Sequence, residues 1–139
     1  MEHKNIMYRL NTTLMTIDTA YEKIAKNHGI TFNSLMLLYT LRENENVTQS
    51  QVCKQLLLPK STVHSILQKF IKEQSITLTT GDNKKEKIIV VTEIGKERFK
   101  SIYKDINTFE ENLLHGLGTD NCNNLLYISD LVTKIINKN

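Results

Sequence analysis

Apolar residues recur every three or four positions along most of the chain, which is the spacing of one face of an α-helix. The first stripe predicts a helix over residues 2–27, which Gly29 ends because glycine readily takes the left-handed conformation found after helices. Thr31 is a predicted N-cap for a second helix, which stops at the polar run 42–46. Two further helices are predicted near the C-terminus. One runs from Thr92 to about 116–118, and the other from 119 or 120 to about 136.

Two shorter helices are predicted in the middle of the chain, separated by a single proline. Thr48 and Gln51 have the spacing of a capping box, in which a hydroxyl and an amide each satisfy a free backbone donor. Pro59 ends this first helix, because proline lacks an N–H group and disfavours helix at the preceding residue. The second helix is predicted from Lys60 to about Gln74. Two short helices joined by a tight break form a helix-turn-helix.

A change of period after residue 74 predicts a β-hairpin. Residues 75–80 alternate polar and apolar side chains, as a half-buried strand does. Residues 81–83 favour a turn, residues 84–87 form a charged tip, and the β-branched run 88–91 predicts the returning strand. The predicted fold class is therefore mainly α with a small β-wing, with a winged helix-turn-helix over residues 30–100.

The segments on either side of this region, residues 1–28 and 101–139, carry more apolar side chains than a winged helix can cover. Their stripes extend from Ile6 to Ala25 in the first and from Leu125 to Ile136 at the end of the second. Unburied apolar faces of this size imply a partner, and a second copy of the chain is the simplest one. We therefore expect these segments to act as dimerisation helices of a homodimer.

Composition and charge narrow the class of protein. Of the 139 residues, 40% are hydrophobic and 24% charged, which excludes a disordered tail or a fibrous repeat. No run approaches the roughly 18 apolar residues of a membrane span. The basic-then-apolar start of a secretion signal is also missing, so we expect a cytoplasmic protein that does not bind membranes.

The net charge of +3 is unevenly distributed. Residues 47–100 carry ten Lys/Arg and five Asp/Glu, a net charge of +5, and the remainder carries a net charge of −2. A positive middle is typical of a segment that contacts a polyanion, although a lysine-rich solvated surface has the same composition.

Four short motifs, taken together, resemble the MarR family of bacterial transcription regulators. They are Gly29-Ile30-Thr31, Val-Thr-Gln-Ser-Gln-Val at 47–52, Leu-Pro-Lys-Ser-Thr-Val at 58–63 and Val-Thr-Glu-Ile-Gly at 91–95. The resemblance covers essentially the whole chain and implies a single MarR-type domain over residues 1–139. It also implies a homodimer with interleaved terminal helices, whose two winged helices bind a palindromic operator in double-stranded DNA.

Three positions depart from the family pattern. Ser65 stands where the recognition helix usually carries an arginine, and Gln74 stands where a small turn residue, glycine, is expected. At the wing, Asp-Asn-Lys-Lys at 82–85 replaces an acidic-plus-arginine pattern. Because lysine is a point charge without the bidentate fork of arginine, we expect the wing to grip phosphates rather than to read bases.

The second helix of the helix-turn-helix is predicted to turn Val63, Ile66, Leu67 and Phe70 towards the core and to leave a polar face outward. Ser, Thr, His and Gln can donate to phosphates or base edges, and a lysine at the helix start suits a phosphate. The alternative is a polar face and turn that are merely solvated. The predicted DNA-binding residues are Lys60, Ser61, Thr62, His64, Ser65, Gln68, Lys69, Lys84, Lys85 and Lys87.

The sequence predicts no cofactor and no metal site. None of the four histidines has a second histidine four residues away, as a zinc-binding helix would. Cys53 and Cys122 are too few for a disulfide framework. Their thiols are either bystanders or, for Cys122 near a helix start, open to redox sensing.

The family resemblance implies a small-molecule effector bound between the dimer helices and the winged region. Tyr8, Met15, Tyr39 and Tyr103 are candidates for such a pocket, and they suit the hydrophobic core equally well.

The predicted function is therefore a sequence-specific DNA-binding transcriptional regulator, a ligand-responsive repressor. An enzyme is not expected, because the chain has no glycine-rich phosphate loop and no nucleophile elbow. The alternative is a winged-helix adaptor that binds proteins and no DNA. A DNA titration at two salt concentrations separates the two, since the affinity of a regulator falls steeply with salt.

Overall fold

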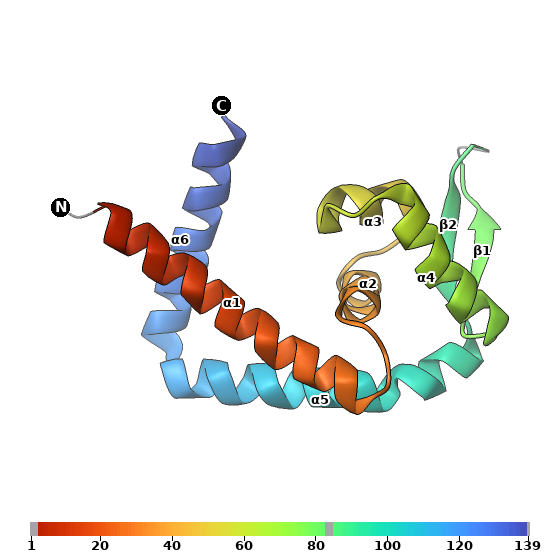
Figure 1. Ribbon diagram of the computed structural model, residues 1–139, viewed down its shortest axis with the longest axis horizontal. Coiled ribbons are helices and arrows are strands. Elements are labelled where there is room, and N and C mark those ends of the chain that lie inside the picture. Colours follow the sequence, from red (N-terminus) through yellow and green to blue (C-terminus); the bar gives the residue numbers. More distant parts are fainter. Residues whose placement is uncertain (1–2, 83–84, 139) are drawn as a thin grey trace. The chain divides into compact units, whose positions relative to one another are not determined.

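The computed structural model describes residues 3–82 and 85–138 and has six helices and a two-stranded sheet in these ranges (Figure 1). In chain order the elements are α1 (His3–Asn27), α2 (Phe32–Glu43), α3 (Gln49–Leu56), α4 (Lys60–Lys72), β1 (Ile76–Thr80), β2 (Lys87–Val91), α5 (Glu93–Leu117) and α6 (Thr119–Asn137). The predicted fold class, mainly α with a β-wing, is confirmed. The chain divides into two compact units, Met1–Tyr103 and Lys104–Asn139, and the boundary falls within α5.

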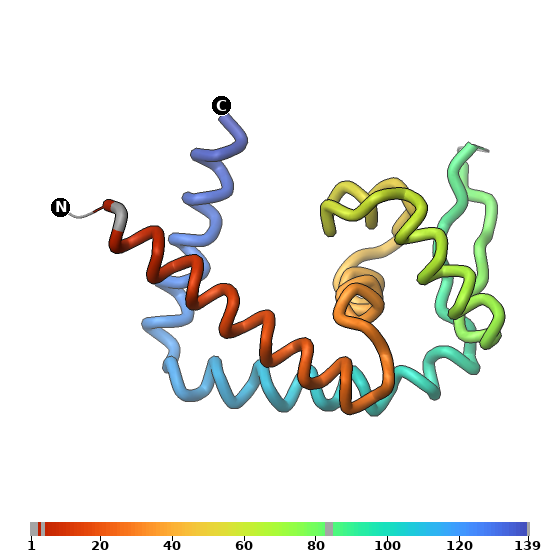
Figure 2. The backbone as a smooth tube through the Cα atoms, viewed as in Figure 1, coloured from red at the N-terminus to blue at the C-terminus, as the bar shows by residue number. Residues whose placement is uncertain are grey.

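The helix ends follow the local signals in the sequence. The Thr31 side chain accepts a hydrogen bond from the Ser34 backbone N–H at 3.1 Å, and Gly29 before it has a φ of +69°. Thr48 and Gln51 form both hydrogen bonds of the capping box that opens α3. The two helices of the helix-turn-helix follow one another along the tube of Figure 2, separated by Leu57, whose φ is +54°, and by Pro59.

The expected end of α4 is wrong by two residues. The helix ends at Lys72, and Gln74 has a φ of +63°, a left-handed conformation that cannot continue a right-handed helix. Its backbone N–H still bonds the carbonyl of Ile71 at 2.9 Å, which closes the turn into β1. Gln74 therefore takes the conformation for which a glycine would be better suited.

The wing is an antiparallel hairpin with a third segment beside it. Strand β1 pairs with β2 in the register Ile76↔Val91 to Thr80↔Lys87. On its other edge β2 contacts the residues before α3, where the Ile89 backbone N–H donates to the Val47 carbonyl at 2.8 Å. This pairing fixes the wing against the start of the helix-turn-helix. It was not predicted from the sequence, which indicated only the two-stranded hairpin.

A close backbone approach joins the start of α5 to the loop before β1. Thr92 caps α5, since its Oγ1 accepts from the Gly95 N–H at 3.0 Å, and the same hydroxyl donates to the Gln74 carbonyl at 2.6 Å. A Cβ on Gly95 would collide with the carbonyl oxygen of Ser75. Thr92 therefore binds both segments of this junction, and Gly95 lets their backbones approach closely.

Buried side chains from every element of the winged region form its core. Phe99 of α5 packs edge-on against Phe70 of α4, with ring centroids 5.4 Å apart. The core residues of the first unit include Leu35, Leu37, Leu38, Val47, Val52, Val63, Leu67, Phe70, Ile76, Ile89 and Phe99.

The terminal helices keep large apolar side chains exposed. On α1 they are Ile6, Met7, Tyr8, Leu10, Leu14 and Met15. On α6 no residue is buried, and Leu125, Leu126, Tyr127, Ile128, Leu131, Val132, Ile135 and Ile136 are all exposed. Across residues 3–82 and 85–138, no helix has both the length and the apolar character required to cross a membrane.

Candidate nucleic-acid interface

Helix α4 separates an apolar face from a polar one. Val63, Leu67 and Phe70 are buried, and Ile66 is half-buried. Most of the predicted DNA-binding residues on this helix are exposed, and they are Lys60, Ser61, His64, Ser65, Gln68 and Lys69. Thr62 is only half-exposed, so the structure places it at the border of the polar face rather than on it.

The hydroxyl of Ser65 already has a partner within the helix. Its Oγ donates to the Ser61 carbonyl at 3.0 Å, the hydrogen bond that serine forms to the preceding turn. Ser65 therefore presents an acceptor rather than a free donor to a ligand, and Gln68 and His64 carry the neighbouring polar groups.

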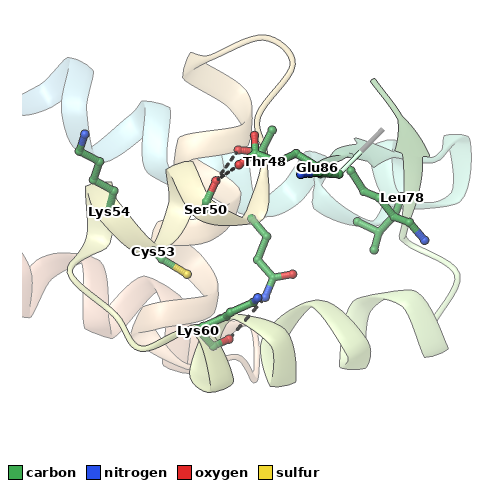
Figure 3. A pocket seen from close by; sticks show the side chains of 10 residues that line it. Thr48, Ser50, Cys53, Lys54, Lys60, Leu78 and Glu86 are labelled. Carbon is green, nitrogen blue, oxygen red and sulfur yellow. Dashed lines mark hydrogen bonds between the residues drawn. The ribbon is translucent and has the colours of Figure 1, made fainter. Parts of the chain in front are cut away.

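A cavity of about 680 Å³ lies between the start of α3, the start of α4 and the wing (Figure 3). Among the described residues, the lysines that line it are Lys54, Lys60, Lys85 and Lys87. Three of these lysines, Lys60, Lys85 and Lys87, are among the predicted DNA-binding residues, and the structure brings them together from α4 and the wing. Lys84, also predicted, lies outside the described residues.

The lining also includes Lys54, Gln49, Ser50 and Glu86, which are not among the predicted DNA-binding residues. Ser50 Oγ donates to Glu86 Oε1 at 2.8 Å, and Gln49 Nε2 donates to the Lys60 carbonyl at 3.4 Å. The first bond ties α3 to the wing and the second ties α3 to α4. Lys54 could have been found from its place on the polar side of α3, whereas the Ser50–Glu86 contact joins residues 36 apart and has no local signal.

A second cluster surrounds Arg42 at the end of α2. The guanidinium lies over the rings of Tyr39 and Tyr103, at 5.1 and 5.3 Å from their centroids, and pairs with Glu43 at 2.9 Å. The Tyr103 hydroxyl donates to the Leu38 carbonyl at 3.0 Å. Burial raises the pKa of Tyr103 to about 12, against a smaller lowering by Arg42, so this phenol is neutral at physiological pH.

Two of the four candidate effector residues, Tyr39 and Tyr103, meet in this cluster around Arg42. Tyr8 and Met15 are exposed on α1, at 70% and 65% of their surface.

The two cysteines lie in different surroundings. Cys53 is half-buried and lines the lysine-rich cavity, and the Cys122 thiol donates to the Leu114 carbonyl at 3.4 Å. Within the described residues, no three His, Cys, Asp or Glu side chains come together as a metal site would require.

Comparison with known proteins finds a family match over the helix-turn-helix and most of the wing. Residues 28–85 match the model of the MarR family. The chain is 21% identical over 112 residues to the uncharacterized HTH-type transcriptional regulator YwoH of Bacillus subtilis, covering 81% of this chain and 82% of that protein.

Solved structures share the fold over nearly the whole chain. The NadR–4-hydroxyphenylacetate complex superposes with a TM-score of 0.79 at 16% identity, covering 97% of this chain and 94% of NadR. Staphylococcus aureus MarR with salicylate and kanamycin gives 0.77 at 16%, covering 97% and 92%. NMB1585, a MarR family regulator from Neisseria meningitidis, gives 0.77 at 20%, covering 95% and 94%. Residues 28–85 are therefore similar to the MarR family of transcription regulators, and the chain shares the winged helix-turn-helix fold of the solved MarR structures along nearly its whole length.

Proposed function

We propose that this protein is a homodimeric, sequence-specific DNA-binding regulator in the cytoplasm that represses transcription by occupying a palindromic operator. The observation that carries this proposal is the position of the lysines. Lys54, Lys60, Lys85 and Lys87 surround one cavity next to the exposed polar face of α4. Lysines on a helix-turn-helix and its wing can bind the phosphates of a DNA duplex, and phosphate contacts supply a large share of the binding free energy.

The proposed contacts divide by chemistry. The lysines of the cavity and the start of α4 hold phosphates, and His64, Ser65 and Gln68 face the base edges of the major groove. Gln68 can pair with N6 and N7 of adenine, whereas no arginine on this face pairs with guanine. We therefore expect an operator rich in A·T pairs and modest discrimination between sequences.

The dimer would form through residues 1–28 and 101–139. The exposed apolar side chains of α1 and α6 belong to these segments. An obligate dimer typically buries more than about 2,000 Å² in total, so we expect the interleaved apolar faces to bury an area of this size. Residues 30–100 would then form the DNA-binding region of each copy.

The regulator would respond to a small aromatic acid bound at the Arg42 cluster. NadR and S. aureus MarR were solved with 4-hydroxyphenylacetate and with salicylate. Arg42, which lies over Tyr39 and Tyr103 and pairs with Glu43, would exchange that carboxylate for the one of the ligand, and the two rings suit an aromatic body. The ligand would release DNA by changing the distance between the two recognition helices of the dimer.

The proposal is tested by titrating a labelled genomic fragment with the protein at 50 and 200 mM salt. A regulator with several phosphate contacts loses affinity steeply between these concentrations, with a log–log slope of about −0.9 for each contact. Changing both Lys85 and Lys87 to Ala should weaken binding to all sequences equally and reduce that slope. Absence of binding at both salt concentrations would favour the adaptor function. Selection of bound fragments from genomic DNA would then locate the operator.

A further inference from the structure

The lysine-rich cavity contains a negative charge that the proposed DNA-binding function does not explain. Of the described residues that line it, Glu86 alone carries a carboxylate, against Lys54, Lys60, Lys85 and Lys87. In Figure 3 Glu86 lies beside Ser50 and Thr48 on one side of the cavity, and Lys60 lies on the opposite side. An acid in this place opposes the approach of any polyanion to the four lysines.

The bond that holds Glu86 there is one that a phosphate could replace. Ser50 Oγ donates to Glu86 Oε1 at 2.8 Å, and both side chains are exposed. A hydroxyl that donates to a carboxylate oxygen donates equally well to a phosphate oxygen. Because the bond is exposed to water, breaking it costs little, so an incoming anion can compete for the hydroxyl.

We propose that Glu86 is an internal substitute for a DNA phosphate. In the free protein its carboxylate occupies the cavity between α3 and the wing, and on binding a phosphate of the duplex displaces it and takes over the Ser50 hydroxyl and the surrounding lysines. Glu86 thereby weakens binding to DNA of every sequence, which favours release from non-operator sites. This inference rests on the proposed DNA-binding function.

The main experiment compares Glu86→Gln with wild type by fluorescence anisotropy on a labelled duplex of arbitrary sequence. Glutamine keeps the size of the side chain and removes its charge. Relief of one charge–charge repulsion at contact distance in water should tighten binding about fivefold at low salt. The gain should shrink as salt increases, because salt screens the repulsion. The matched control is Glu97→Gln, which removes the same charge from an exposed position on α5 outside the cavity lining and should change affinity much less.

Ser50→Ala separates displacement from a purely structural bond. If phosphate takes over the hydroxyl, Ser50→Ala should weaken DNA binding more in the Glu86→Gln background than in wild type. In wild type the same change also releases the Glu86 carboxylate from the cavity, and this release offsets part of the loss in affinity. If the bond merely braces the wing, Ser50→Ala should weaken binding at least as much in wild type as in the Glu86→Gln background, because the glutamine oxygen also accepts from the serine hydroxyl, and that result would overturn the proposal. Thermal denaturation of both variants checks that the winged region stays folded.

Two further outcomes are decisive. Equal affinities for Glu86→Gln and Glu97→Gln, with wild type binding the duplex, would overturn the role of Glu86 and leave the regulator function intact. A wild-type chain that binds no duplex at 50 mM salt would overturn the regulator function and this inference with it.

Discussion

The winged region and the terminal helices expose opposite kinds of surface. The winged region has a buried apolar core, in which Leu35, Leu37 and Leu38 have 0% exposure, and the outward face of α4 is polar. On the first half of α1 and along α6 the large apolar side chains stay exposed, and Leu126 keeps 63% of its surface. The winged region therefore has a core within the chain, whereas exposed apolar faces like those of α1 and α6 are typical of a protein–protein interface.

The core of the winged region should be the most sensitive part of the chain. Phe99 is 1% exposed and its ring contacts both Phe70 and Tyr103. Changing Phe99 to Ala removes these contacts and leaves a cavity, so the free energy of unfolding should fall by about 3–5 kcal/mol. Urea denaturation measures this change. The control is Ile94→Ala on the same helix, where the side chain is 50% exposed and the loss should stay below about 1 kcal/mol. Equal losses would show that Phe99 is not part of a closed core.

A charge on α6 tests whether the second region is covered by another copy. Leu126 is exposed in the single chain, so Leu126→Glu should leave an isolated monomer almost unchanged. In a dimer it would bury an unpaired charge and weaken association by about 3–5 kcal/mol. Light scattering at micromolar concentration measures the mass in solution.

The matched control for this variant is Asn123→Glu, an equally charged change at an exposed polar position of the same helix. A wild-type mass of one chain, 16.1 kDa, would contradict the expected homodimer.

The polar face of α4 should respond to a change in hydrogen-bonding chemistry rather than in packing. Ser65 is exposed and its hydroxyl is bonded to the Ser61 carbonyl, so Ser65→Arg adds a bidentate donor without disturbing the core. We expect higher affinity for all DNA and a preference for guanine at one position of each half-site, worth about 1–3 kcal/mol. Because the proposed dimer is symmetric, the shift should appear twice in a binding-site selection. If wild type and variant select the same consensus, residue 65 does not face the groove.

Local interactions were predictable from the sequence, and contacts between distant segments were not. The caps at Thr31, Thr48 and Thr92 depend on residues three or four positions away, and each has the predicted place. The outward face of α4 follows from helical period in the same way.

The missed contacts join residues far apart in the chain. The pairing of Val47 with Ile89 and the bond from Ser50 to Glu86 join segments that only the folded chain brings together. Three of the cavity lysines were predicted one by one from the sequence, but their meeting in one cavity depends on these long-range contacts and had no local signal.

The smallest expected effect tests the conformation of a single residue in the winged region. Gln74 has a φ of +63°, which costs a residue with a side chain about 1–2 kcal/mol relative to the right-handed region. Glycine takes this conformation without that cost but loses more backbone entropy on folding, about 0.5–1 kcal/mol. Gln74→Gly should therefore raise the free energy of unfolding by about 0.5–1 kcal/mol, as the difference between these two terms.

The control is Gln74→Ala, which keeps a Cβ and should give no such gain. Because the gain arises within one chain, it should be the same at every protein concentration, unlike the effect of a change on α6. Equal stabilities of the glycine and alanine variants in urea denaturation would show that the turn after α4 carries no strain.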